Sequence, residues 1–347
     1  LDKNFRHLSR KEKLQQLVDK QWLSEEQFDI LLNHPLIDEE VANSLIENVI
    51  AQGALPVGLL PNIIVDDKAY VVPMMVEEPS VVAAASYGAK LVNQTGGFKT
   101  VSSERIMIGQ IVFDGVDDTE KLSADIKALE KQIHKIADEA YPSIKARGGG
   151  YQRIAIDTFP EQQLLSLKVF VDTKDAMGAN MLNTILEAIT AFLKNEFPQS
   201  DILMSILSNH ATASVVKVQG EIDVKDLARG ERTGEEVAKR MERASVLAQV
   251  DIHRAATHNK GVMNGIHAVV LATGNDTRGA EASAHAYASR DGQYRGIATW
   301  RYDQDRQRLI GTIEVPMTLA IVGGGTKVLP IAKASLELLN VESAQIG

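Results

Sequence analysis

The chain has 347 residues, a net charge of −9, 44% hydrophobic and 24% charged residues, and no cysteine. The lack of cysteine excludes disulfides, a thiolate nucleophile and cysteine-bound metal, and the negative charge argues against a general nucleic-acid binder. With no apolar run long enough to span a membrane and no secretory pattern at Leu1, we expect a globular, cytoplasmic protein of two or three domains, without a membrane partner.

The first fifty residues are predicted to form three short helices. Capping-box patterns at Ser9–Glu12 and Ser24–Gln27 mark the starts of the first two helices, and the third is predicted over residues 39–50. Glycines and prolines between residues 53 and 61 then lead into an extended segment around residues 63–72.

Two adjacent carboxylates follow, in the run Glu77, Glu78, Pro79 and Ser80. Neighbouring carboxylates repel each other and are not buried cheaply unless they are paired or protonated. Pro79 suits the first position of a helix, and small residues behind it favour close packing. The run is either an acidic turn that complements a helix dipole, or it presents Glu78 to a cleft with Ser80 as a hydroxyl donor.

Residues 105–208 are predicted to form a domain of their own. The pattern gives strand, helix, strand, strand, helix and strand, which is the ferredoxin-like order. The expected elements span residues 105–113, 119–140, 152–159, 164–172, 179–197 and 202–207. The predicted fold class is therefore α+β, with a large mixed α/β domain (1–104 and 209–347) into which the ferredoxin-like domain (105–208) is inserted.

The remaining part of the chain is predicted to contain a helix over 230–248, a hairpin of strands 297–302 and 309–315, and a final helix over 332–339. The stretch 254–265 is rich in polar residues and glycine. Arg254 could bind a carboxylate in a two-pronged contact, and Lys260 could stabilise an oxyanion, although a solvated polar loop explains the stretch equally well. No metal-ligand spacing joins the histidines, so His258 is interpreted as a polar packing group.

Three further segments suit polar ligands. Asp276 follows the apolar stretch 268–272 and is predicted at a strand end, where functional groups are common, or in an ordinary turn. The stretch 175–183 joins a strand to a helix, and Gly178 leaves the helix start open to a phosphate or another polar group, unless an Asp or Asn simply caps the helix. Residues 323–326 form either an anion-binding loop or an ordinary glycine turn. No Rossmann or Walker fingerprint is present.

Six segments together resemble 3-hydroxy-3-methylglutaryl-CoA (HMG-CoA) reductase of the soluble bacterial class II type, over nearly the whole chain. The resemblance implies an oxidoreductase of the mevalonate pathway, in which two hydrides from NAD(P)H reduce HMG-CoA to mevalonate and CoA. It also implies a homodimer with shared active sites and a cofactor domain that lacks a Rossmann fold. The segments are Glu47–Ile50, Glu77–Ser80, Asp175–Asn180, His258–Gly261, Gly274–Asp276 and Gly323–Thr326.

The resemblance assigns roles to residues. It makes Glu78 a proton donor, Lys260 the group that polarises the thioester carbonyl, and Asp276 a hydrogen-bond partner of Lys260. Because Asp276 would partly neutralise Lys260, Glu78 is expected to stay protonated near neutral pH, with coupled titration of all three. Ser80, Arg254 and Asn264 are expected to contact the hydroxymethylglutaryl group. The cofactor side is expected to comprise Asp175, Met177, Gly178, Asn180, Asn183, Gly323 and Gly324.

The chain departs from the family pattern in two places, and a third region bears on cofactor choice. The family has a catalytic histidine on a C-terminal flap, but no histidine follows His285 here, so we expect weak or no turnover. The alternative is then a catalytically impaired fragment that only binds acyl-CoA or nucleotide, or a structural or regulatory protein. Ala51 stands where the family usually has glycine. Tyr141, Lys145 and Arg147 suit a 2′-phosphate, which favours NADPH over NADH.

Overall fold

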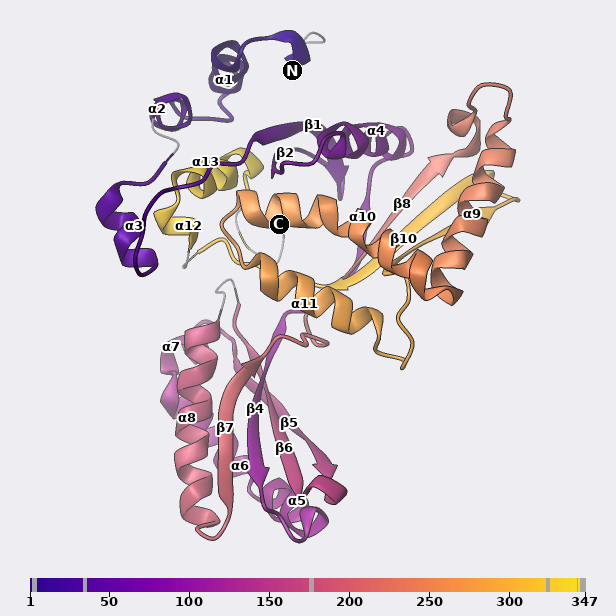
Figure 1. Ribbon diagram of the computed structural model, residues 1–347. Coiled ribbons are helices and arrows are strands. Elements are labelled where there is room, and N and C mark those ends of the chain that lie inside the picture. The colour runs from indigo at the N-terminus through magenta and orange to yellow at the C-terminus, as the bar shows by residue number, and fades with distance from the viewer. Residues whose placement is uncertain (2–4, 34–35, 175–177, 323–324, 342, 344–347) are drawn as a thin grey trace. The chain divides into compact units, whose positions relative to one another are not determined.

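Figure 1 shows a computed structural model, which describes residues 1, 5–33, 36–174, 178–322, 325–341 and 343. The chain forms two compact units. The first comprises Leu1–Ser103, Val216–Val315 and Leu319–Gly347, and the second comprises Glu104–Val215 and Pro316–Thr318. The second unit extends beyond the predicted 105–208, because backbone hydrogen bonds from Ile106 to Ala213 (2.9 Å) and from Met317 to Ser214 (2.8 Å) add the later segments to it.

The first unit begins with the three predicted helices, α1 (Arg10–Asp19), α2 (Glu25–Asn33) and α3 (Glu39–Leu45), after a short 3-10 turn η1 (Phe5–His7). The capping box at the start of α1 is present, since Ser9 and Glu12 exchange hydrogen bonds of 2.8 and 3.3 Å. Helix α3 ends at Leu45, earlier than predicted. Leucines of the first two helices share a buried cluster with α13 (Pro330–Leu339).

A hairpin of β1 (Val57–Val65) and β2 (Lys68–Met75) follows. Helices α4 (Val81–Asn93) and α10 (Ile252–Ala272) pack on it through a buried cluster that includes Leu60, Met74, Ala89 and Ala268. The loop between β2 and α4, which carries the paired carboxylates, is thereby brought beside α10.

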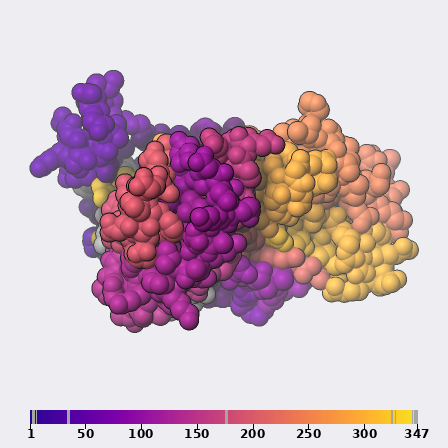
Figure 2. Space-filling model, turned by 90° about the horizontal axis from the view of Figure 1, so that it is seen from below, coloured from indigo at the N-terminus to yellow at the C-terminus, as the bar shows by residue number. Residues whose placement is uncertain are grey.

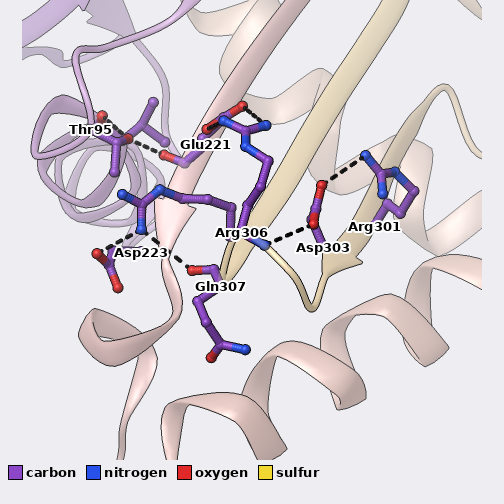
Figure 3. Close-up of polar contacts among 9 residues, drawn as sticks. Thr95, Glu221, Asp223, Arg301, Asp303, Arg306 and Gln307 are labelled. Carbon is purple, nitrogen blue, oxygen red and sulfur yellow. Dashed lines mark hydrogen bonds and ion pairs between the residues drawn. The ribbon is translucent and has the colours of Figure 1, made fainter.

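The larger sheet of this unit has the order β3-β8-β10-β9. Its strands are β3 (Lys99–Ser103), β8 (Val215–Asp223), β9 (Ala298–Asp303) and β10 (Arg308–Pro316), and the last two form the predicted hairpin. The hairpin turn is tied to β8, because Arg306 donates two hydrogen bonds to Glu221 (2.9 and 2.8 Å) and Arg308 pairs with Asp223 (2.7 Å) (Figure 3). The 3-10 turn η3 (Val224–Leu227) and the helices α9 (Gly234–Val250), α11 (Thr277–Ala288) and α12 (Gly325–Val328) complete the unit.

The second unit has an antiparallel sheet of order β5-β6-β4-β7, which is a ferredoxin-like arrangement. Alternating residues such as Ile111, Phe113 and Leu165 face the helices and are fully buried. The predicted helix 119–140 is two helices broken at Leu129, whose N–H bonds to the Ile126 carbonyl (3.0 Å). The elements are β4 (Ile106–Asp114), α5 (Thr119–Ala128), α6 (Glu130–Ala140), α7 (Pro142–Ala146), β5 (Gly150–Phe159), η2 (Pro160–Gln162), β6 (Leu164–Asp172), α8 (Ala179–Glu196) and β7 (Asp201–Ser208).

In the space-filling view, the atoms of the second unit, coloured from purple to red, form a closed surface (Figure 2). Its apolar core is buried beneath that surface. Within the described ranges, no helix combines the length and the apolar character needed to cross a membrane.

Candidate active site

The loop that connects β2 to α4 holds Glu78 and Ser80 at the surface. Ser80 is the N-cap of α4 and has a left-handed backbone (φ 71°), but its hydroxyl does not cap the helix. Pro79 therefore precedes the helix instead of occupying its first position. A left-handed residue other than glycine is strained, and such strain is concentrated at functional sites. The loop thus leaves the side chains of Glu78 and Ser80 exposed, and the Ser80 hydroxyl is not used to cap the helix.

Lys260 extends from α10 and donates a hydrogen bond to the carboxylate of Glu78. This hydrogen bond and the charge of Lys260 hold the pKa of Glu78 below its usual value of 4.5, with help from a hydrogen bond to Asn264. Asn264 lies one turn after Lys260, so both face the same loop. The three predicted residues Glu78, Lys260 and Asn264 therefore meet in one cluster.

The protonation state of Glu78 differs from the prediction. A lowered pKa makes this carboxylate an anion at neutral pH, whereas we expected it to carry a proton. The reason is the hydrogen bond from Lys260, which lowers the pKa by more than the desolvation of the carboxyl group raises it. The pair is also open to solvent, since 42% of the Glu78 side chain and 60% of the Lys260 side chain are accessible.

Asp276 does not join this cluster within one chain. It is the N-cap of α11, where its Oδ1 accepts a hydrogen bond from the Gly279 N–H (3.0 Å). The helical residues from Lys260 to Ala272 rise about 18 Å along α10 before Asp276 is reached. No hydrogen bond or ion pair links Asp276 to Lys260 in the described part of the chain. Asp276 also follows a helix, α10, and not the predicted strand.

Arg254 lies in the first turn of α10, and Asp251 caps the helix by accepting hydrogen bonds from the backbone of His253 and Arg254. Among the residues that the structure describes, no carboxylate pairs with the Arg254 guanidinium. The polar stretch 254–265 is therefore helical, and the interpretation as a loop is wrong. The unpaired cation remains free to bind a carboxylate ligand.

The predicted cofactor segment lies in the second unit, at the start of α8. Gly178 is the N-cap with φ 79°, and a Cβ there would approach Thr173 Cγ2 to 2.5 Å and Met107 Sδ to 2.8 Å. Asn183, in the first turns of the helix, has a buried Oδ1 without a hydrogen-bond partner, and Asn180 is exposed. The backbone N–H groups at a helix start that only glycine fits suit a phosphorylated ligand, and the unsatisfied Oδ1 of Asn183 suits a hydrogen-bond donor on a ligand.

The other predicted cofactor residues lie outside the described part of the chain. They are Asp175, Met177, Gly323 and Gly324.

The sequence assigned no role to Asn259, which the fold buries completely next to Lys260. Its Nδ2 donates to the Arg295 carbonyl (2.8 Å) and its Oδ1 accepts from the Ile297 N–H (2.9 Å). Asn259 thus fixes α10 against the segment that follows α11. The position of Asn259 inside the 258–261 motif was the only sequence feature that pointed to a role for it. The sequence could not predict its partners, because Arg295 and Ile297 lie more than thirty residues away.

The chain matches the family model for hydroxymethylglutaryl-coenzyme A reductase over residues 9–346. It is 39% identical over 344 residues to the 3-hydroxy-3-methylglutaryl-coenzyme A reductase of Archaeoglobus fulgidus, covering 98% of this chain and 77% of the relative. A probable reductase of Borreliella burgdorferi is 34% identical over 343 residues, covering 99% of this chain and 77% of the relative.

Solved structures give the same result. A class II reductase from Streptococcus pneumoniae, bound to NADPH in open conformations, superposes with a TM-score of 0.94 at 41% sequence identity. The superposition covers 99% of this chain and 93% of the Streptococcus pneumoniae chain. A second structure of the reductase from Streptococcus pneumoniae has the same TM-score and identity and is covered over 82% of its length.

Proposed function

The chain belongs to the hydroxymethylglutaryl-coenzyme A reductase family, and on that premise we propose how its own residues carry out the reaction. The activity is the reduction of HMG-CoA to mevalonate and CoA, with two hydrides and two protons consumed. The hydrogen bond between Lys260 and Glu78, with Asn264 beside it, carries the proposal.

Lys260 acts on the thioester carbonyl. Hydride addition builds negative charge on that oxygen, and an ammonium group in a site that excludes water stabilises such charge by about 3 kcal/mol. In the free protein this ammonium is bonded to Glu78. Substrate entry would turn it toward the carbonyl, while Asn264 stays in place to hold the carboxylate.

Glu78 supplies a proton after its environment changes. The free carboxylate is an anion, because the Lys260 hydrogen bond lowers its pKa. Substrate binding would exclude water from Glu78 and take Lys260 to the carbonyl. Both changes raise the pKa of the carboxyl group toward neutrality, where it can donate a proton to a developing alkoxide. Ser80 and Arg254 would contact the hydroxyl and carboxylate ends of the hydroxymethylglutaryl group.

NADPH is the proposed cofactor, and when bound it would supply the hydrides. The start of α8 fits its polar groups, through the backbone at Gly178 and the side chains of Asn180 and Asn183. Lys145 and Arg147 supply positive charge at the end of α7 for a 2′-phosphate, although Lys145 already pairs with Asp138. The solved Streptococcus pneumoniae reductase bound to NADPH supports this assignment.

We propose that two copies of the chain share active sites, with Asp276 of the partner subunit beside Lys260. Asp276 is too far along α10 to serve Lys260 in its own chain. Exposed apolar side chains at the junction of α9 and α10 offer a dimerisation surface: Val246, Leu247, Val250 and Ile252 are 42%, 47%, 63% and 56% exposed. We also propose the cytoplasm as the compartment, since a chain without cysteine is compatible with reducing conditions.

The catalytic roles are tested with Lys260→Ala and Glu78→Gln in the full-length enzyme. Both are expected to lower kcat by about a hundredfold or more while NADPH still binds. Lys333→Ala is the matched control, because Lys333 forms an exposed ion pair with Glu26 (3.1 Å) elsewhere in the same unit. Wild-type kcat in either Lys260→Ala or Glu78→Gln would exclude the proposed mechanism.

The shared site is tested by mixing inactive Lys260→Ala and Asp276→Ala chains. If the two residues come from different subunits, the mixed dimer contains one intact site, and random mixing restores about a quarter of the wild-type activity. If both residues acted within one chain, every site in the mixture would carry a defect and no activity would return.

A further inference from the structure

The imidazole of His258 is packed against the segment that joins α11 to β9. Its ring shares a hydrogen bond with the backbone of Ala298, and this bond raises the pKa of the ring, so the ring is the donor. Its Cδ2 lies 3.1 Å from the position that a Cβ on Gly296 would occupy, so residue 296 leaves little room for a side chain. His258 therefore has a fixed orientation on α10.

The second ring nitrogen of His258 is unsatisfied. Nε2 is buried and has no hydrogen-bond partner in the part of the chain that the structure describes. Because the bond to Ala298 occupies Nδ1, the hydrogen of the neutral ring resides there, and Nε2 carries a lone pair that can only accept. Buried acceptors without a partner are rare and call for a specific explanation.

Arg254 can supply a donor to this nitrogen. It lies four residues before His258, a spacing that places two side chains next to each other on a helix. Burial first, and the charge of Arg254 second, lower the pKa of His258 from 6.5, so the ring is neutral at pH 7. The neighbouring amide of Gln249 uses one of its two hydrogens on the Gly296 carbonyl (2.9 Å), whereas the Arg254 guanidinium has five N–H donors and no carboxylate partner among the described residues.

We propose that His258 is a positioning residue for the acyl substrate. When the substrate binds, Nε2, which has no partner among the described residues of the free protein, accepts a hydrogen bond from the Arg254 guanidinium and aims that group at the substrate carboxylate. The inference rests on the proposed role of Arg254. A guanidinium has five N–H donors, so it can bond to His258 and still present two N–H groups to a carboxylate. A neutral acceptor orients the cation without neutralising its charge, which an aspartate or glutamate at position 258 would do.

Two amide substitutions of His258 in the full-length enzyme distinguish the roles of the two ring nitrogens, Nδ1 and Nε2. His258→Asn keeps a donor at the Nδ1 position for Ala298 and removes the acceptor at Nε2. We expect the Kd for HMG-CoA, measured by calorimetry, to rise about tenfold, with the Kd for NADPH and the Tm unchanged. His258→Gln restores an acceptor near Nε2 and loses the bond to Ala298, so its Tm should fall while its Kd for HMG-CoA stays within about twofold of wild type.

Wild-type HMG-CoA binding by His258→Asn, or equal weakening by both variants, would overturn the inference. A double-mutant cycle adds a second test, because His258→Asn should weaken binding no further in an Arg254→Ala background. An additive loss there would mean that His258 acts independently of Arg254. Wild-type affinity of Arg254→Ala itself would overturn the proposed carboxylate site, a result distinct from failure of the His258 variants alone.

Discussion

Lys260 on α10 donates a hydrogen bond to Glu78, which lies 182 positions earlier in the chain. The contact forms because the β1–β2 hairpin packs against α10 around Met74 and Ala268, which brings the loop after β2 to the exposed side of the helix. The proposed reductive site thus comes from two elements that share a buried cluster, and its two charged groups pair with each other in the free protein.

This ion pair sets the titration of Glu78. In the free protein, the carboxyl group should titrate below 4.5, since Lys260 stabilises its anion. Lys260→Ala should move the pKa back up toward 4.5, and a bound unreactive HMG-CoA analogue should raise it further. Carbon NMR of labelled glutamate carboxyl groups measures all three values. A pKa that does not respond to Lys260→Ala would contradict the ion pair.

Much of the fold followed from local patterns. The alternation of Leu165, Leu167 and Val169 predicts a strand with one buried face, and these residues are fully buried in β6. The strand and helix order of residues 105–208 was sufficient to predict the ferredoxin-like sheet. These elements are regular because propensity, alternation and burial agree.

Helix α10 shows where a prediction from the local sequence pattern fails. Its glycines and polar residues suggested a loop, yet Ala255, Asn259 and Met263 repeat every four residues and form its buried stripe. Gly261 has open space where a Cβ would stand, so the helix tolerates it through tertiary packing on the other side. The five apolar residues before Thr273 were too few to distinguish a strand from the last turn of a helix.

The candidate site depended on the family resemblance more than on local patterns. No periodicity relates Glu78 to Lys260, because their contact arises from the packing of distant elements. The spacing also gave no warning that Asp276 lies at the far end of α10. Nor did it indicate that the hydrogen bond from Lys260 would leave Glu78 ionised, since a pKa depends on the folded surroundings of the group.

A substitution of Gly178, at the start of α8, tests two effects of an added side chain: backbone strain and steric clash with neighbouring side chains. A second glycine with a similar φ but no close neighbours separates the two effects. Gly178→Ala forces a side chain into a left-handed backbone and against Thr173 and Met107, and should destabilise the fold by about 2–3 kcal/mol while weakening NADPH binding. Gly148→Ala has a similar φ of 77° but meets nothing within 4 Å. The control should therefore lose only about 1 kcal/mol. Denaturant unfolding measures both, and equal losses would exclude the predicted collision.

Asn259 should be critical for the stability of the fold and for the position of Lys260 on α10. Asn259→Ala leaves the Arg295 carbonyl and the Ile297 N–H without their partner inside the protein, and should lower the free energy of unfolding by about 2–4 kcal/mol. Asn33→Ala, which removes an exposed hydrogen bond to Asp29 on α2, should change it by less than about 0.5 kcal/mol. Urea unfolding of the two variants provides the comparison, and a stable Asn259→Ala variant would refute the buried anchor.

The bidentate contact of Arg306 with Glu221 should contribute little, despite its good geometry (Figure 3). Both side chains are partly exposed, so Arg306→Ala should destabilise the fold by about 1 kcal/mol or less and leave kcat unchanged. The loss should shrink further at high salt, which screens exposed charges. A thermal unfolding series in increasing salt tests this, and a large loss independent of salt would point to a structural role beyond the ion pair.

Arg147 should determine the preference for NADPH. Its Nε donates to the Ser143 carbonyl (3.1 Å), which fixes the side chain at the end of α7, and no carboxylate pairs with it in the described ranges. Lys145, by contrast, is already paired with Asp138. Arg147→Ala should raise KM for NADPH about tenfold by removing one cation from a phosphate, with KM for NADH unchanged. Lys121→Ala, on the exposed side of α5, controls for the loss of a positive charge in the same unit. Equal increases with NADPH and NADH would show that Arg147 does not read the 2′-phosphate.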